Sequence, residues 1–356
     1  MHVEIHFPED YPLEELIRYG SELVVDGIVA PGFIPPGRGA LDPAALHYMQ
    51  TIENRPATML LDLNIVTEIA NIASGNLDII TSDFRRSVGK LMAVCQLNDV
   101  ALDPSLAIHE KAQTMGHERA REMLEWFRAG DNASPWEWLE IARGTPAPLS
   151  TKRVSATLPG MLDTPIRRFG RNYLLSLKIA DLALDPTKTS IGRLTEFVEW
   201  IREHMYWAGS AALFAATYLS PEGPKAGLME RLKSPNRSKA LDGARKQAWD
   251  LTHLSEFGKA VAKAGDRRRL LFATKDQGLA TMARLVCVYP SASEIEDVFS
   301  PWWGPVDAAT VGKMYSSAIE TAEATRDQHQ PISGKPESWV DAETRRLEEK
   351  IEAWRP

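Results

Sequence analysis

Short apolar runs alternate with amphipathic stretches in two separate parts of the chain. Runs at Ala57–Leu61 and Val100–Leu102 are each followed by a helical pattern, which predicts two strand–helix units. Further along, Leu270–Ala273 reads as a strand, Gln277–Ala283 as a helix and Leu285–Tyr289 as another strand. Strands that alternate with helices favour a three-layer α/β/α fold with a central parallel sheet.

The remaining hydrophobic pattern is mostly helical. The apolar run Tyr206–Leu219 has 14 residues, short of the roughly 20 that a membrane span needs, so it predicts a buried helix and no membrane contact. An amphipathic helix is predicted over Trp339–Trp354, either docked on its own chain or contacting a partner or a second copy. Further elements are a strand at Val3–Phe7 and helices at Leu13–Leu23, Ile65–Ala73, Phe84–Leu97 and Lys239–Ala264.

These patterns divide the chain into three parts. Residues 1–57 form an N-terminal extension, and residues 58–290 form the α/β domain. This domain contains a helical insertion at about 116–238, where helical patterns are interrupted by proline-bearing loops. Residues 291–356 form a helical C-terminal tail.

Composition narrows the class of protein. The chain has 356 residues, of which 44% are hydrophobic and 25% charged, so a sizeable core can form and the disordered and fibrous classes are excluded. Cys95 and Cys287 can build neither a disulfide framework nor a zinc site, which favours a reducing compartment. Because the first residues lack the pattern of a signal peptide, we expect a cytoplasmic protein.

The charge is unevenly distributed along the chain. With 41 basic and 48 acidic residues the net charge is −7, which argues against a general nucleic-acid binder. However, residues 1–57 and 290–356 each carry −6, so residues 58–289 carry +5. The net negative charge of the chain thus comes from its two ends, whereas the segment between them is basic, as expected of a protein that handles RNA.

Two stretches of the insertion concentrate this positive charge. Residues 143–178 carry +6 and residues 222–246 carry +4. One interpretation is a surface that follows the phosphates of RNA, and the other is a set of solvated helix faces. The residues chosen as candidate RNA contacts are Arg167, Arg168, Arg171, Arg237, Lys239, Arg245 and Lys246.

Several carboxylates are predicted at one edge of the sheet. Asp62 ends the first strand of the domain, and Asp276 follows Leu270–Ala273. Glu110 lies on the helix after the second strand, and Asp250 on the helix before Leu270–Ala273. Ligands of parallel α/β sheets bind at the carboxyl ends of the strands.

Carboxylates gathered there repel one another unless a cation neutralises them, and oxygen ligands suit Mg²⁺ or Mn²⁺. Each aspartate also has a simpler interpretation, because Asp after a strand is a common helix N-cap. Asp103, directly before Pro104, reads as such a turn and is left out of the site. His109 and His253 are interpreted as local helix residues.

Four segments together resemble the PIN-domain ribonucleases. The segment LLDLNIVTEI (60–69) is similar to that family's first strand, in which Asp-x-Asn follows an apolar run. VALDPSLAIHE (100–110) resembles its second unit, and AWDLTHLSEF (248–257) resembles the helix with its third acid. LLFATKDQGLATMARLVCVYP (270–290) matches its strand, Thr-x-Asp and short helix. The chain departs from compact toxin-type members in the 140 positions between Glu110 and Asp250.

The resemblance implies roles for six residues. Asp62, Glu110, Asp250 and Asp276 would hold one or two Mg²⁺ or Mn²⁺ ions, and a metal-activated water would attack a phosphodiester. Asn64 and Thr274 would hydrogen-bond to these carboxylates and orient them.

The sequence therefore predicts a PIN-like, metal-dependent endoribonuclease acting on RNA in the cytoplasm. By the family's usual roles it would be a toxin or a defence nuclease. Two alternatives stay open. One is a non-catalytic PIN-like scaffold that binds a protein partner or a second copy of the chain, and the other is a structure-specific DNA nuclease.

Overall fold

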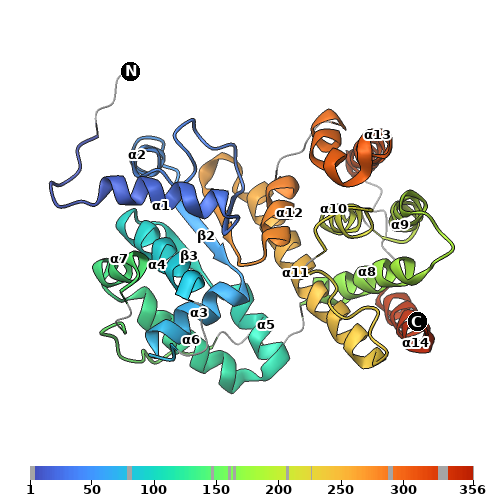
Figure 1. The fold of residues 1–356 in the computed structure, drawn as a ribbon, viewed down its shortest axis with the longest axis horizontal. Coiled ribbons are helices and arrows are strands. Elements are labelled where there is room, and N and C mark those ends of the chain that lie inside the picture. The colour runs from blue at the N-terminus through green and yellow to red at the C-terminus, as the bar shows by residue number, and fades with distance from the viewer. Residues whose placement is uncertain are drawn as a thin grey trace. The chain divides into compact units, whose positions relative to one another are not determined.

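A computed structural model describes residues 5–77, 82–145, 148–158, 162, 166–205, 208–225, 227–287, 292–327 and 336–355. The chain forms two compact units (Figure 1). Unit 1 comprises Met1–Pro165 and Phe257–Cys287, and unit 2 comprises Ile166–Glu256 and Val288–Pro356. The division falls inside one continuous helix, α11 (Arg237–Ala264), after Glu256.

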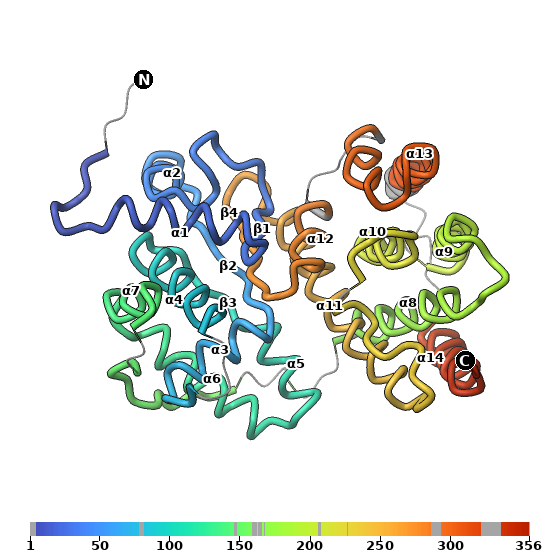
Figure 2. The backbone as a smooth tube through the Cα atoms, in the orientation of Figure 1, coloured from blue at the N-terminus to red at the C-terminus, as the bar shows by residue number. Residues whose placement is uncertain are grey.

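Unit 1 contains a four-stranded mixed sheet. Its strands lie in the order β1 (Val29–Pro31), β4 (Arg269–Ala273), β2 (Ala57–Leu61) and β3 (Ala101–Asp103), all labelled in Figure 2. β2 pairs in parallel with both β3 and β4, whereas β1 pairs antiparallel with β4. This sheet with its helices is compatible with the predicted α/β class, but the predicted parallel sheet is not confirmed, because β1 runs antiparallel to β4.

The side chains of β2 alternate between buried and half-buried along the strand. Ala57, Met59 and Leu61 are buried, whereas the two residues between them are half-buried, the alternation expected of a pleated strand. In the parallel register Leu61 lies opposite Ala273, so β2 and β4 end side by side. The two chain segments that leave the sheet there begin with Asp62 and Thr274.

Two predicted strands are wrong where the structure describes them. Residues 285–287 of the predicted strand Leu285–Tyr289 belong to helix α12 (Gln277–Cys287), and the rest lies outside the described residues. A short apolar run fits a helix as well as a strand, and α12 is a helix that buries Leu279 and Met282. Residues 5–7 of the predicted strand Val3–Phe7 have no regular structure, and its first two residues are not described.

Three helices of unit 1, α1 (Leu13–Val25), α3 (Leu63–Ala73) and α4 (Ser82–Leu97), begin and end within two residues of their predicted positions. α4 packs against α1 and α7, and α6 packs against α3 and α5. The Trp138 indole on α7 is fully buried and donates to the Gly130 carbonyl of α6 at 2.9 Å. Besides α12, the helices are α1 (Leu13–Val25), α2 (Pro43–His47), α3 (Leu63–Ala73), α4 (Ser82–Leu97), α5 (Ser105–Met115), α6 (His117–Asp131) and α7 (Pro135–Arg143).

Unit 2 is helical where the structure describes it. α14 packs along α8, where Tyr173 donates to Glu348 at 2.7 Å, so the predicted amphipathic tail is a docked helix. No described helix of the chain combines the length and the apolar character needed to cross a membrane. The helices of unit 2 are α8 (Arg167–Leu184), α9 (Ser190–His204), α10 (Gly209–Tyr218), the first part of α11, α13 (Ala292–Asp327, kinked at Gly304) and α14 (Glu337–Ala353).

The close approach of α4 and α7 depends on Gly89. A Cβ atom there would lie 2.7 Å from the Ala142 amide nitrogen and 2.9 Å from Ile141 Cγ2. We expect Gly89→Ala to destabilise the protein by about 1–3 kcal/mol, because the overlap outweighs the helix propensity of alanine. Denaturant unfolding of the full chain checks this. Gly170→Ala in α8, where the added Cβ meets nothing within 4 Å, is the control. Equal stability of the two variants would contradict the prediction.

Candidate metal centre

Asp62 stands at the junction between β2 and α3. Its backbone N–H donates to the Ala273 carbonyl at 2.9 Å, which extends the β2–β4 pairing by one residue. Its Oδ1 then accepts the N–H of Leu63 at 2.7 Å, at the first turn of α3. The residue is only 5% exposed. Asp62 is therefore a helix cap as well as a candidate ligand.

The second carboxylate oxygen of Asp62 is held by two side chains. Oδ2 accepts hydrogen bonds from Asn64 Nδ2 at 2.6 Å and from the Thr274 hydroxyl at 2.7 Å. Asn64 Oδ1 in turn accepts the N–H of Lys275 at 3.0 Å, so the two segments that leave the sheet are tied together. These contacts are the kind that fix the orientation of a metal-binding carboxylate.

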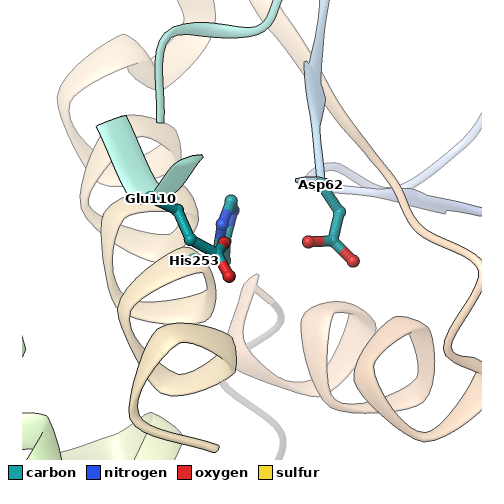
Figure 3. A group of neighbouring side chains, drawn as sticks. All are labelled: Asp62, Glu110 and His253. Atoms are coloured by element: carbon teal, nitrogen blue, oxygen red, sulfur yellow. The ribbon is translucent and has the colours of Figure 1, made fainter. Parts of the chain in front are cut away.

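Asp62 forms a candidate ligand group with Glu110 and His253. Each of these three residues offers one ligand atom, and the three atoms lie within 4.8 Å of one another (Figure 3). Glu110 lies on α5, the helix that follows β3, and is half-buried. His253 lies on α11 and is 2% exposed, one turn before Phe257, whose ring packs against Phe272 of β4 at 5.4 Å. We call these three residues the 62–110–253 group.

The 62–110–253 group has the composition of a cation site. Bonds of about 2.0–2.4 Å allow two ligand atoms of one ion to lie at most some 4–5 Å apart, and the three atoms here lie within 4.8 Å of one another. The two carboxylates, one buried and one half-buried, repel each other, and a divalent cation would reduce that repulsion. The two carboxylates suit Mg²⁺ or Mn²⁺, whereas the imidazole suits ions such as Zn²⁺ or Fe²⁺.

The other two predicted ligands, Asp250 and Asp276, are not members of this group. Asp276 is half-buried, and its Oδ1 accepts the N–H of Leu279 at 3.0 Å, which caps α12. Asp250 is also half-buried and lies three residues before His253 on α11. The structure thus brings two of the four predicted acids together and adds a histidine.

The sequence pattern marks His253 only as a helix residue, and the structure places it in the 62–110–253 group. Asp250 and His253 lie three residues apart on one face of α11, but Asp250 is not a member of the group, so this spacing does not predict the role of His253. Asp103 behaves as expected, since its Oδ1 accepts the N–H of Ser105 at 2.9 Å in a turn.

Among the predicted RNA contacts, four cations are paired with carboxylates. These pairs are Arg168 with Glu256 at 3.4 Å, Arg171 with Glu337 at 3.5 Å, Arg245 with Glu348 at 3.1 Å and Lys246 with Glu230 at 3.7 Å. Their charges are locally balanced, which weakens a long-range attraction for phosphate.

The other three candidates differ from one another. Arg237 is buried, donates to the carbonyls of Ile351 and Leu232, and so holds the C-terminal helix. Lys239 is exposed, and the side chain of Arg167 lies outside the described part of the structure. RNA contact by these seven residues stays a prediction.

A second buried acid lies on α3, four residues after Asn64 and therefore on the same helix face. Glu68 is 7% exposed, and no described group hydrogen-bonds to its Oε1. Burial raises the pKa of Glu68 to about 7, against the opposing charges of Lys275 and Arg85. Glu68 is therefore largely neutral below pH 7.

Because Glu68 is buried with a raised pKa, we expect the stability of the protein to depend on pH. Because the folded pKa is raised, the folded state holds a proton that the unfolded state loses, so stability falls as pH rises from about 4.5 to about 7. Glu68→Gln removes this loss, and we expect its stability relative to wild type to grow over that range, by at most about 3 kcal/mol. Denaturant unfolding of both proteins at pH 5 and pH 8 measures it. A difference independent of pH would show that Glu68 does not titrate in this window.

Comparison of the chain with models of protein families, with curated proteins and with solved structures finds no match in any of the three. The resemblance to PIN-domain ribonucleases still rests on the four sequence segments.

Proposed function

We propose that this chain is a metal-dependent endoribonuclease of PIN-like, three-layer fold that hydrolyses RNA phosphodiesters. The observation that carries the proposal is the 62–110–253 group, in which Asp62 stands at the carboxyl end of β2. Ligand sites in parallel α/β sheets lie at this end of the strands. The group therefore has both the side chains that can bind a cation and the position in the sheet where a ligand is expected.

The arrangement of the strands supports the PIN-like part of the proposal. β3, β2 and β4 are neighbours and run parallel, so the helix after β3 and the loop after β4 start from the edge where β2 ends. Glu110 is on that helix, and Thr274 opens that loop. The resemblance requires this convergence of segments from distant parts of the sequence.

The chemistry proposed is attack of water on phosphorus. A bound divalent cation would lower the pKa of a water molecule and neutralise charge on the phosphate. The water oxygen would form the new bond to phosphorus and lose one proton to solvent, while the bond from phosphorus to the leaving oxygen would break and that oxygen would take up a proton from solvent. Asp62 and Glu110 supply negative charge for the cation, while Asn64 and Thr274 hold Asp62 in one orientation.

The biological setting is proposed from the resemblance. We propose a cytoplasmic toxin or defence nuclease, with Mn²⁺ or Mg²⁺ as its cofactor and RNA as its substrate. A non-catalytic scaffold and a DNA-directed nuclease are separated from this proposal by the experiments below.

Asp62→Asn tests the function directly. Asparagine is a good N-cap, so α3 can still be capped, but the side chain loses the charge that the cation needs. We expect Mn²⁺-dependent cleavage of single-stranded RNA to fall at least about 100-fold, the upper range for lost metal-site groups. The control is Asp103→Asn, which changes an aspartate in a turn of the same unit.

Three outcomes would contradict the proposed function. Cleavage by Asp62→Asn at the wild-type rate would remove the site assignment. No Mn²⁺ binding by wild type in calorimetric titration would favour the scaffold. Faster cleavage of flapped or single-stranded DNA than of RNA would favour the DNA nuclease.

The ligand set is tested by a second pair of variants. If the 62–110–253 group holds the ion, His253→Ala weakens Mn²⁺ binding at least about 10-fold, as expected for a lost ligand. Asp276→Asn leaves this binding close to wild type, because Asp276 caps α12 and asparagine can do the same. Calorimetric titration of both variants with Mn²⁺ measures the difference. Loss of binding in Asp276→Asn alone would instead favour the ligand set implied by the resemblance.

A further inference from the structure

Lys275 lies at the carboxyl end of β4, between Thr274 and Asp276. Its backbone N–H donates to Asn64 Oδ1 at 3.0 Å, and Asn64 also donates to Asp62 Oδ2 at 2.6 Å. The backbone of Lys275 is therefore fixed, through one side chain, to the carboxylate at the centre of the candidate site. Its side chain is exposed.

The ammonium group of Lys275 is held without being neutralised. Its Nζ lies 4.4 Å from the centre of the Phe84 ring, and Phe84 is itself buried in unit 1. A cation above a ring face is attracted to it but keeps its full charge. Across the described residues, no carboxylate comes within 4.0 Å of this Nζ to form an ion pair.

Lys275 differs in this respect from the cations selected from the sequence. Arg168, Arg171 and Arg245 each lie beside a glutamate. The charge of Lys275 is instead available to an anionic ligand, and it stands next to the candidate centre rather than in the basic stretches of the insertion.

The nearby acid does not cancel this charge at moderate pH. Glu68 is buried, and Lys275 and Arg85 are the charged groups that act on it. Because burial raises the pKa of Glu68 to about 7, the acid is mostly neutral at pH 6 and mostly ionised at pH 8. The local positive charge is therefore greater at the lower pH.

We propose that Lys275 binds a backbone phosphate of the RNA substrate beside the candidate metal centre, with Phe84 holding its ammonium group in position. This inference rests on the proposed function for the identity of the substrate. The ligand chemistry is that of a phosphodiester chain, and the cation acts as a point charge on one phosphate.

Binding in the absence of metal tests the proposal separately from cleavage. A fluorescently labelled single-stranded RNA is titrated in EDTA at several salt concentrations with wild type, Lys275→Ala, Lys275→Arg and Lys263→Ala. Lys263 is an exposed lysine near the end of α11 within unit 1, and it serves as the matched control. Single-stranded DNA of the same sequence forms a parallel arm.

We expect Lys275→Ala to raise Kd about 5- to 10-fold at low salt. We also expect it to reduce the slope of log K against log salt by about 0.7, the value for one lost phosphate contact on a single strand. Lys275→Arg and Lys263→Ala should bind nearly as wild type does. An equal loss with DNA supports recognition of the shared phosphodiester, and a smaller loss supports RNA selectivity.

Wild-type affinity in Lys275→Ala, or an equal loss in Lys263→Ala, would overturn the proposal even if Asp62→Asn abolishes cleavage. Failure of wild type to bind RNA would overturn it as well. RNA binding that depends on Lys275 in a protein that never cleaves would support the inference while the proposed function fails.

The contribution of Glu68 is tested by measuring RNA affinity at two pH values. Glu68→Gln should bind RNA as wild type does at pH 6 and more tightly than wild type at pH 8, because only wild type gains a negative charge beside Lys275. Identical affinities of the two proteins at both values would remove Glu68 from the inference.

Discussion

The candidate site depends on the parallel pairing of β2 with β4. This pairing places the first residue after β2 beside the first residue after β4, and these residues are Asp62 and Thr274. Burying a carboxylate is costly unless its oxygens accept hydrogen bonds. Asp62 accepts them from Leu63, Asn64 and Thr274, which come from both segments. The sheet and the site therefore stabilise each other, since displacing either strand would leave the buried carboxylate without its donors.

The local elements could be predicted because their signals are local. β2 was predicted at the residues where it lies, and α3 and α4 within two residues, since apolar spacing and capping residues are read over a few positions. The antiparallel β1 was not predicted, because three residues carry too little pattern and their pairing with β4 is a long-range contact. The error at residues 285–287 has a related cause, since their apolar run ends a helix whose length only the fold decides.

The residues of the candidate site that directly follow a strand could be predicted from the sequence. Asp62, Asn64 and Thr274 follow directly on β2 and β4, so strand pairing alone brings them together. His253 is different, because its role depends on how α11 is rotated about its axis, and the sequence gives no direct measure of that rotation. The same holds for the basic stretches. A charge sum counts Arg168 and Arg245 as free cations, whereas each is paired with a glutamate that only the fold brings near.

The hydrogen bonds of Asp62 limit how it could bind a cation. A carboxylate has about four lone-pair positions, and Oδ2 already accepts two hydrogen bonds, from Asn64 and Thr274. Oδ1 accepts one from Leu63, so a cation can be held by Asp62 through a single oxygen at most. One such bond does not define a metal site, and the hydrogen bonds by themselves account for the burial of Asp62. Glu110 and His253 each bring one further ligand atom within 4.8 Å, so the three residues together form a group that could hold a cation.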